Sequence, residues 1–141
     1  MLHDDRLIYM LSRAQHALMS YLKKELGAND AAITPVQAGI LFLLRKKGHT
    51  MTQLSRILAI DNSAITGLVD RLEKAGLAKR TANPDDRRTF LIRITKKGKD
   101  EIDRAYGTIK RVNDEIKSGF SKDEIRTFKN VLNSLLDKFA K

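Results

Sequence analysis

Residues 61–95 switch from helical to strand periodicity, and this switch constrains the fold more than any other feature of the chain. Its first part places apolar residues at helical spacing: Ile65, Leu68, Val69 and Leu72. Gly76 follows where a left-handed residue would end the helix. Segments 77–81 and 89–94 have the composition of half-buried strands, and Asn-Pro-Asp-Asp at 83–86 is typical of a turn. We therefore predict a helix followed by a β-hairpin.

The opposite face of this helix is small and polar. It carries Ser63, Thr66, Gly67 and Asp70. Asn62 or Ser63 is expected to cap the helix start. Bulky side chains would hold the helix backbone away from the edges of the bases, so a narrow polar face indicates a helix that lies in the major groove of a duplex.

The hairpin and the segment after it concentrate the positive charge of the chain. The formal net charge is +10, and residues 78–99 hold eight cations against the two anions Asp85 and Asp86. The cations are Lys79, Arg80, Arg87, Arg88, Arg93, Lys96, Lys97 and Lys99. A solvated hairpin, in which Asp86 and Arg88 only pin the turn, is one interpretation. A basic ribbon directly after a helix of this kind favours contact with DNA.

The combined motifs resemble the winged helix-turn-helix of the MarR (multiple antibiotic resistance regulator) family of transcription factors. The resemblance covers residues 34–98. Its matching residues are Leu54-Ser55, Ala59-Ile60-Asp61, Ile65-Thr66, Val69-Asp70-Arg71-Leu72-Glu73, Gly76-Leu77, Asn83-Pro84-x-Asp86-Arg87-Arg88 and Ile94-Thr95-x-x-Gly98. Single motifs such as Leu-Glu-Lys-Ala-Gly-Leu suit many winged-helix proteins, whereas the Asp-x-Arg hairpin in register with all the others is specific.

The resemblance implies roles for particular residues. Arg88 would be the wing arginine that enters the minor groove, with Asp86 orienting it. A narrow minor groove concentrates negative potential, which suits a guanidinium. Asp61 and Arg71 match positions that can pair with wing residues or with a phosphate. Many members carry a long polar residue where this chain has Gly67, so the operator preference is expected to differ from theirs.

Helices on either side complete the predicted helix-turn-helix. Thr34-Pro35-Val36-Gln37 forms a capping box with proline at the first helical position, and the helix is expected to direct Ile40, Leu41, Leu43 and Leu44 inward and to end at Gly48. Residues 52–58 form the next helix, whose Leu54, Ile57 and Leu58 would pack onto the helix that follows. His49 is expected in a turn or a short third strand.

The two ends of the chain are predicted to form long amphipathic helices. The first covers residues 4–26 and ends near Gly27, with a stripe that includes Ala14 and Tyr21. Thr95 can cap a helix after the hairpin, and Ser121 opens a capping box for the last one. The residues predicted to form a dimer interface are Leu7, Leu11, Leu18, Ile125, Phe128, Leu132, Leu135 and Phe139. Packing of these stripes within one monomer is the alternative.

Length and composition allow one domain (1–141), mainly α with a small β-hairpin wing. Within it we expect a DNA-binding module at 34–98 and a helical dimerisation region at 1–27 and 99–141. The chain has no cysteine and no apolar run long enough for a membrane span, which predicts a cytoplasmic protein without disulfides or a membrane partner. Three scattered histidines and no glycine-rich phosphate loop indicate no enzyme and no cofactor. His3, Asp4 and Asp5 are too close to a terminus to predict a metal site.

These features together predict a homodimer that binds a pseudo-palindromic site in double-stranded DNA and regulates transcription, as a repressor by the resemblance. The helix at about 62–75 would enter the major groove and the wing at about 78–94 the minor groove. The predicted DNA contacts are Asn62, Ser63, Ala64, Thr66, Gly67, Asp70, Arg71, Lys79, Arg80, Arg87, Arg88, Lys96 and Lys97, with Asp61 and Asp86 orienting the wing. A non-specific architectural DNA-binding protein is the main alternative, and a purely structural or protein-docking role is the next.

The resemblance also implies release of DNA by a small aromatic anion. The sequence does not identify that effector or its site. Aromatic and methionine residues that could line a cleft are Tyr9, Met10, Met19, Tyr21 and Phe42. Residues of these types at helical spacing are more typical of a core.

Overall fold

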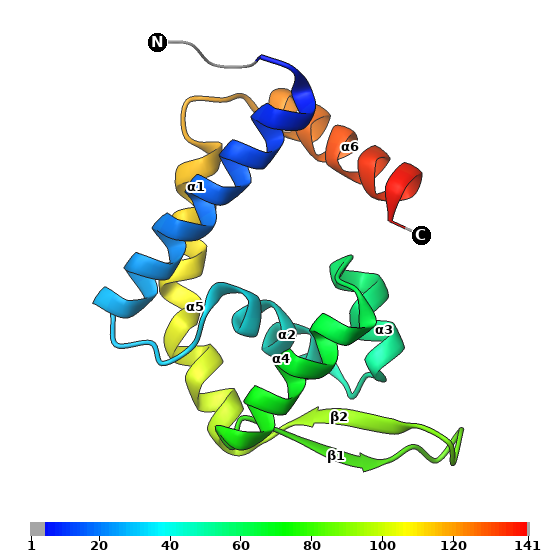
Figure 1. Cartoon of the computed structure of the whole chain (residues 1–141). Helices are drawn as coiled ribbons and strands as arrows, with labels where there is room; N and C mark the ends of the chain where they lie inside the picture. Colours follow the sequence, from blue (N-terminus) through cyan, green and yellow to red (C-terminus); the bar gives the residue numbers. More distant parts are fainter. Residues whose placement is uncertain (1–4, 141) are drawn as a thin grey trace.

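The computed structural model describes residues 5–140, and in this range it holds six helices and one two-stranded antiparallel sheet (Figure 1). The order is α1 (Leu7–Ala28), α2 (Pro35–Lys46), α3 (Met51–Leu58), α4 (Asn62–Lys74), β1 (Ala78–Ala82), β2 (Phe90–Ile94), α5 (Lys96–Lys117) and α6 (Lys122–Phe139). The predicted mainly helical fold with a hairpin is confirmed. His3 and Asp4 lie outside the described residues.

The core lies where α2, α3, α4 and the hairpin meet α5. Its fully buried side chains include Ile40, Leu41, Leu54, Ile65, Leu72, Ile92 and Ile102. Leu43 and Leu68 pack against this cluster and stay partly accessible. Burying such a set stabilises the fold by roughly 25 cal/mol for each Å² of apolar surface removed from water.

Capping fixes where the helices of this core begin. Thr34 and Gln37 form the predicted capping box of α2. Thr50 forms another with Gln53, so α3 begins at Met51, one residue earlier than expected. The prediction that Ile57 packs onto α4 is wrong, because its side chain is 51% exposed. Leu54 and Leu58 lie on the face of α3 that packs on the core. Each residue turns a helix by about 100°, so Ile57, one residue before Leu58, is directed away from that face.

The hairpin pairs β1 with β2 in a regular register that runs from Ala78 opposite Ile94 to Ala82 opposite Phe90. Both strands begin one residue later than the sequence indicated. His49 forms an isolated bridge with Ile92, which favours the short third strand over the turn, the two alternatives predicted for it. Gly98 allows the start of α5 to approach the hairpin, because a Cβ there would overlap the carbonyl oxygen of Leu77. The hairpin is thus held by His49 at the middle of β2 and by the start of α5 at its base, while its tip projects from the molecule (Figure 1).

The long helices form the other end of the molecule. α1 and α5 run side by side in Figure 1, and Arg111 of α5 donates to Glu25 of α1 at 2.9 Å. α6 leaves the end of α5 after its Ser121 capping box, and none of its described residues is buried. Leu7 and Phe139 are 75% and 76% exposed. The apolar stripe of α6 is therefore left largely uncovered by the described part of the protomer.

Candidate nucleic-acid interface

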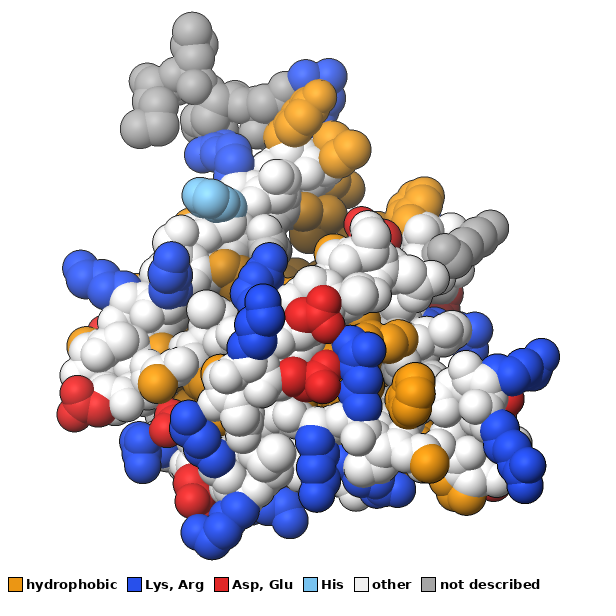
Figure 2. Space-filling view, turned by 60° about the horizontal axis from the view of Figure 1, so that its bottom comes forward, with side chains coloured by type: hydrophobic (Ala, Val, Ile, Leu, Met, Phe, Trp, Pro, Cys, Tyr) orange, Lys and Arg blue, Asp and Glu red, His pale blue; other side chains and the backbone are white. Residues whose placement is uncertain are grey.

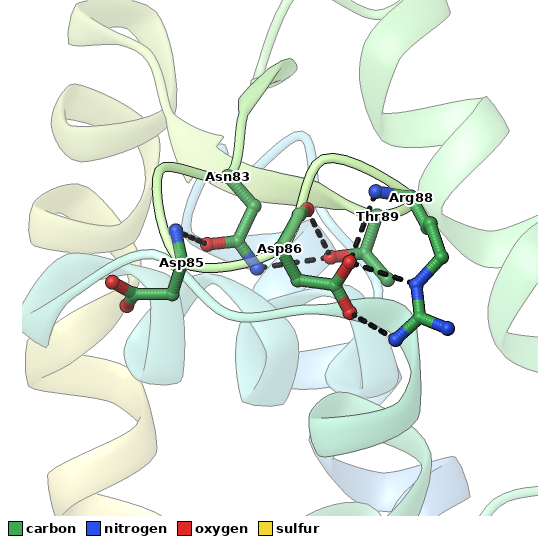
Figure 3. A network of polar contacts seen from close by, with 5 residues as sticks. All are labelled: Asn83, Asp85, Asp86, Arg88 and Thr89. Atoms are coloured by element: carbon green, nitrogen blue, oxygen red, sulfur yellow. Dashed lines mark hydrogen bonds and ion pairs between the residues drawn. The ribbon is translucent and has the colours of Figure 1, made fainter.

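The turn of the hairpin holds Arg88 in a defined position (Figure 3). Its Nε and Nη2 atoms donate to the two carboxylate oxygens of Asp86 at 3.1 and 3.2 Å, and its backbone N–H donates to the same carboxylate at 3.0 Å. Asn83 and Thr89 close the turn around this pair, with Asn83 Nδ2 donating to Thr89 Oγ1 at 2.9 Å. The Asp86–Arg88 pairing expected from the sequence is therefore present.

This pairing orders Arg88 without burying it. The arginine side chain is 89% exposed, whereas that of Asp86 is 34% exposed. The Arg88 guanidinium and the Arg88 backbone N–H hold the pKa of the Asp86 carboxyl below its usual range, so the carboxylate stays charged at neutral pH. An exposed, oriented guanidinium at the tip of a narrow ribbon suits a minor groove, where negative potential is concentrated.

The start of α4 depends on Asp61, and the prediction that Asn62 or Ser63 caps the helix is wrong. Asp61 Oδ1 accepts hydrogen bonds from the Ala64 backbone N–H and from Ser63 Oγ, both at 2.8 Å. Asn62 is the first residue inside the helix because Asp61 already satisfies the free amide there. The expectation that Asp61 orients the wing is not met in this structure, since its hydrogen bonds are local to α4.

We expect Asp61→Ala to lower the midpoint of thermal unfolding and Asp61→Asn to preserve it at neutral pH, because asparagine caps helices as well as aspartate does. The Ala64 N–H bond and then the Ser63 hydroxyl lower the folded-state pKa of Asp61 from 3.8. The stability that its charge contributes is therefore present above pH 4 and lost as the pH falls through the lowered pKa. Circular dichroism melts at pH 7 and pH 3 test this. A wild-type advantage over Asp61→Asn that grows on acidification would contradict it.

Arg80 joins the wing to α4, the helix predicted to enter the major groove and called the recognition helix below. Its Nη2 donates to Asp70 and its Nε to Glu73, each at 2.7 Å. We predicted that Asp70 faces bases and that Arg80 meets phosphate; in this structure the two are paired with each other. Glu73 was missed as a member of this cluster. Its spacing of three residues from Asp70, with an arginine on the next strand, was the available signal.

The remaining cations predicted to contact DNA differ in whether their side chains are bound to other groups of the protein. Lys97 Nζ donates to the carbonyl oxygen of Ala75 at 2.8 Å and so caps the end of α4. Lys96 pairs with Asp100 of its own helix at 3.3 Å. The side chains of Lys79 and Arg87 are exposed and have no hydrogen-bond or ion-pair partner among residues 5–140. Lys and Arg side chains gather along the face that Figure 2 brings forward, which is the face with the hairpin.

The exposed face of α4 has the predicted small, polar character. Ser63, Ala64 and Thr66 are exposed and Gly67 is partly so, whereas Ile65, Val69 and Leu72 are buried on the other side. Thr66 Oγ1 donates to the Asn62 carbonyl oxygen at 2.9 Å, which tethers its hydroxyl to the helix. Side chains this short let a helix approach base edges closely.

Two of the clefts that adjoin the long helices lie next to α1. One, of about 660 Å³, lies between α1 and α2 beside the α3–α4 turn and is lined by residues that include His16, Met19, Lys23 and Val36. The other, of about 990 Å³, is apolar and lies between α1 and α6. Of the five residues suggested for a cleft, Met19 lines the first of these. Tyr9, Met10 and Tyr21 are exposed on α1, and Phe42 packs edge-on against Tyr106.

Residues 5–140 contain no group of three His, Asp or Glu side chains placed to hold a metal ion. None of the helices in this range combines the length and apolarity needed to cross a bilayer.

Comparison with known proteins gives consistent matches. The MarR family model matches residues 33–90. The transcriptional regulator FarR of Neisseria gonorrhoeae is 33% identical over 135 residues, which cover 88% of this chain and 91% of FarR. A mutant MarR of E. coli complexed with operator DNA is 25% identical with a TM-score of 0.80, covering 92% of this chain and 93% of that one. CouR of Rhodococcus jostii bound to p-coumaroyl-CoA is 26% identical with a TM-score of 0.82, covering 94% and 92%.

Proposed function

This chain belongs to the MarR family of transcriptional regulators, and we propose that it acts as a homodimeric repressor that binds a pseudo-palindromic operator. The main support is the Asp86–Arg88 pair, which holds an exposed guanidinium at the tip of the wing. The recognition helix that precedes this wing has a small polar face. Non-specific binding to phosphates needs neither feature. The relatives that this chain matches are transcriptional regulators.

Symmetry sets the geometry of the operator. A two-fold dimer would place its two recognition helices in successive major grooves, about 34 Å apart, with half-sites roughly 10 bp apart between centres. The stripes on α1 and α6 supply the interface, because the exposed apolar side chains there would be covered by the same helices of a second copy.

Selection of bound sequences from a random duplex pool tests this proposal. The expected result is one enriched motif with two-fold symmetry and the spacing given above. Enrichment of no motif, with similar affinity for all duplexes, would favour the architectural alternative. Transcription in vitro from a promoter that contains the selected motif then separates a repressor from an activator.

Lys79 serves as the expected phosphate contact, since it is exposed and unpaired within the described range. Lys79→Ala should lower the affinity for operator and random duplexes by the same factor. It should also flatten the slope of log K against log salt by about one unit. Fluorescence anisotropy titrations at four salt concentrations measure both effects. An unchanged slope, or a loss confined to the operator, would contradict a phosphate contact.

We further propose that the cleft between α1 and α2 receives an aromatic carboxylate. Its apolar lining includes Met19 and Val36, and Lys23 supplies a positive charge for the carboxylate. The same cleft is lined by Leu58, Ala59 and Ile60, which directly precede α4. A ligand that binds better when the two recognition helices are wrongly spaced would lower the affinity for DNA.

Calorimetry of the protein with phenolic carboxylates tests the effector proposal. We expect binding heat, weaker binding after Lys23→Ala, and lower operator affinity in the presence of the ligand. Absence of both heat and any effect on DNA binding across a panel of such acids would support constitutive binding instead.

A further inference from the structure

Gly67 leaves open space on the face of α4 that the proposed function directs into the groove. A Cβ built at Gly67 would meet one described atom within 4 Å, the Nη2 of Arg71 at 3.8 Å. The Arg71 guanidinium therefore lies beside the bare backbone of Gly67, one helical turn before its own Cα.

The direction of side chains in a helix explains this placement. The Cα–Cβ bond tilts toward the helix N-terminus, so a long side chain covers the turn before it, and residues four apart share one face. Any side chain beyond Cβ at position 67 would compete with Arg71 for this surface. Glycine leaves room for the guanidinium beside the N-terminal half of α4, the part of a recognition helix whose residues contact base edges.

The electrostatic surroundings leave Arg71 available. The two acids of α4 nearest to it, Asp70 and Glu73, are both held by Arg80 at 2.7 Å. The Arg71 side chain has no hydrogen-bond or ion-pair partner among residues 5–140. Arg80 thus engages both carboxylates that could otherwise attract Arg71, and it offsets one of their two negative charges. A guanidinium with unpaired donors matches guanine, whose O6 and N7 atoms accept two parallel hydrogen bonds in the major groove.

We propose that Arg71, lying over Gly67, reads a guanine in each half-site and is a specificity-determining residue of this regulator. The inference rests on the proposed function, since it concerns how the recognition helix distinguishes sequences. Its competitor is a phosphate contact by the same side chain, which would raise affinity for every sequence alike.

The experiment measures base preference at every position of the selected motif for wild type and for variants at positions 71 and 67. Arg71→Ala and Arg71→Lys should lose a guanine preference of about tenfold or more at one symmetry-related pair of positions, because lysine lacks the planar fork. Gly67→Gln should show the same loss by displacing the guanidinium. Gly67→Ala should keep the preference, since its Cβ would be at ordinary contact distance from Arg71. Lys74→Ala, a change of another exposed cation on α4, is the matched control.

A second probe isolates the hydrogen bond. Replacing that guanine by an analogue without the N7 acceptor should weaken wild-type binding and should weaken Arg71→Ala binding no further. Circular dichroism and sedimentation confirm that each variant is folded and keeps the wild-type oligomeric state.

The outcomes separate the inference from the function on which it rests. If Arg71→Ala lowers the affinity for selected and random duplexes by the same factor, Arg71 contacts phosphate. The inference is then overturned, while the regulator function stands. If wild type itself enriches no symmetric motif, the proposed function fails and the inference fails with it.

Discussion

Arg88→Ala is expected to weaken operator binding by roughly 1–3 kcal/mol while leaving the fold unchanged. The side chain is 89% exposed and contributes nothing to the core, so its loss removes a contact with DNA and no packing. Gel-shift or anisotropy titrations at fixed salt, beside thermal melts of the same samples, measure the two quantities. Equal operator affinity for wild type and variant would reject the assignment of Arg88 to the minor groove.

Two further variants show what the Asp86 contact adds. Arg87→Ala is the matched control, because Arg87 is an exposed neighbour with no partner in the described range, and its loss should be smaller and equal for all sequences. Asp86→Asn keeps the size of the side chain and removes its charge. We expect a loss between those of the two arginine variants, since the guanidinium remains but is less well oriented.

Leu132→Asp is expected to separate the dimer and to reduce operator affinity by about a hundredfold or more, because a half-site bound by one subunit loses the second set of contacts. Leu132 lies on α6 beside the apolar cleft, and no residue of α6 is buried within the described protomer. The variant should therefore stay folded. A carboxylate placed in the apolar interface costs several kcal/mol of desolvation without a partner.

Asn130→Asp provides the control for this change, since it adds the same charge to the exposed opposite side of α6. Sedimentation equilibrium and operator titrations should show a monomer with weak binding for Leu132→Asp and wild-type behaviour for Asn130→Asp. A stable dimer with full operator affinity after Leu132→Asp would place the interface elsewhere.

Local signals explain which parts of the structure were predictable from sequence. The capping boxes at Thr34 and Ser121, and Gly76 with its φ of 76° at the end of α4, depend on residues within four positions of each other. The hairpin and the Asp86–Arg88 pair are equally local. Such features need no knowledge of how the helices pack.

The missed features depend on contacts between elements. Arg80 looked like a free cation because sequence spacing does not show that β1 returns along α4 and places it beside Asp70 and Glu73. Lys97 reaches the carbonyl oxygen of Ala75 across 22 positions for a similar reason. Asp61 was assigned to the wing by resemblance, whereas the nearer amide of Ala64 binds its carboxylate.

The terminal helices show a limit of another kind. Their apolar stripes were evident, but periodicity alone is the same whether a helix packs on its own chain or on a second copy. The structure adds that no residue of α6 is buried within the described protomer and that an open apolar cleft lies between α1 and α6. This exposed apolar surface supports the dimer. The ion pairs of Arg80 with Asp70 and Glu73 fix the orientation of the wing relative to the recognition helix.

Hydroxyl-radical footprinting of the wild-type protein on its selected duplex tests the central claim most directly. Two subunits that insert their recognition helices into successive major grooves should protect two equivalent patches on one face of the duplex, roughly 10 bp apart, with each wing protecting the flanking minor groove. Removal of Arg88 should erase only the flanking protection. A single unbroken protected tract, or patches on opposite faces of the duplex, would contradict the account.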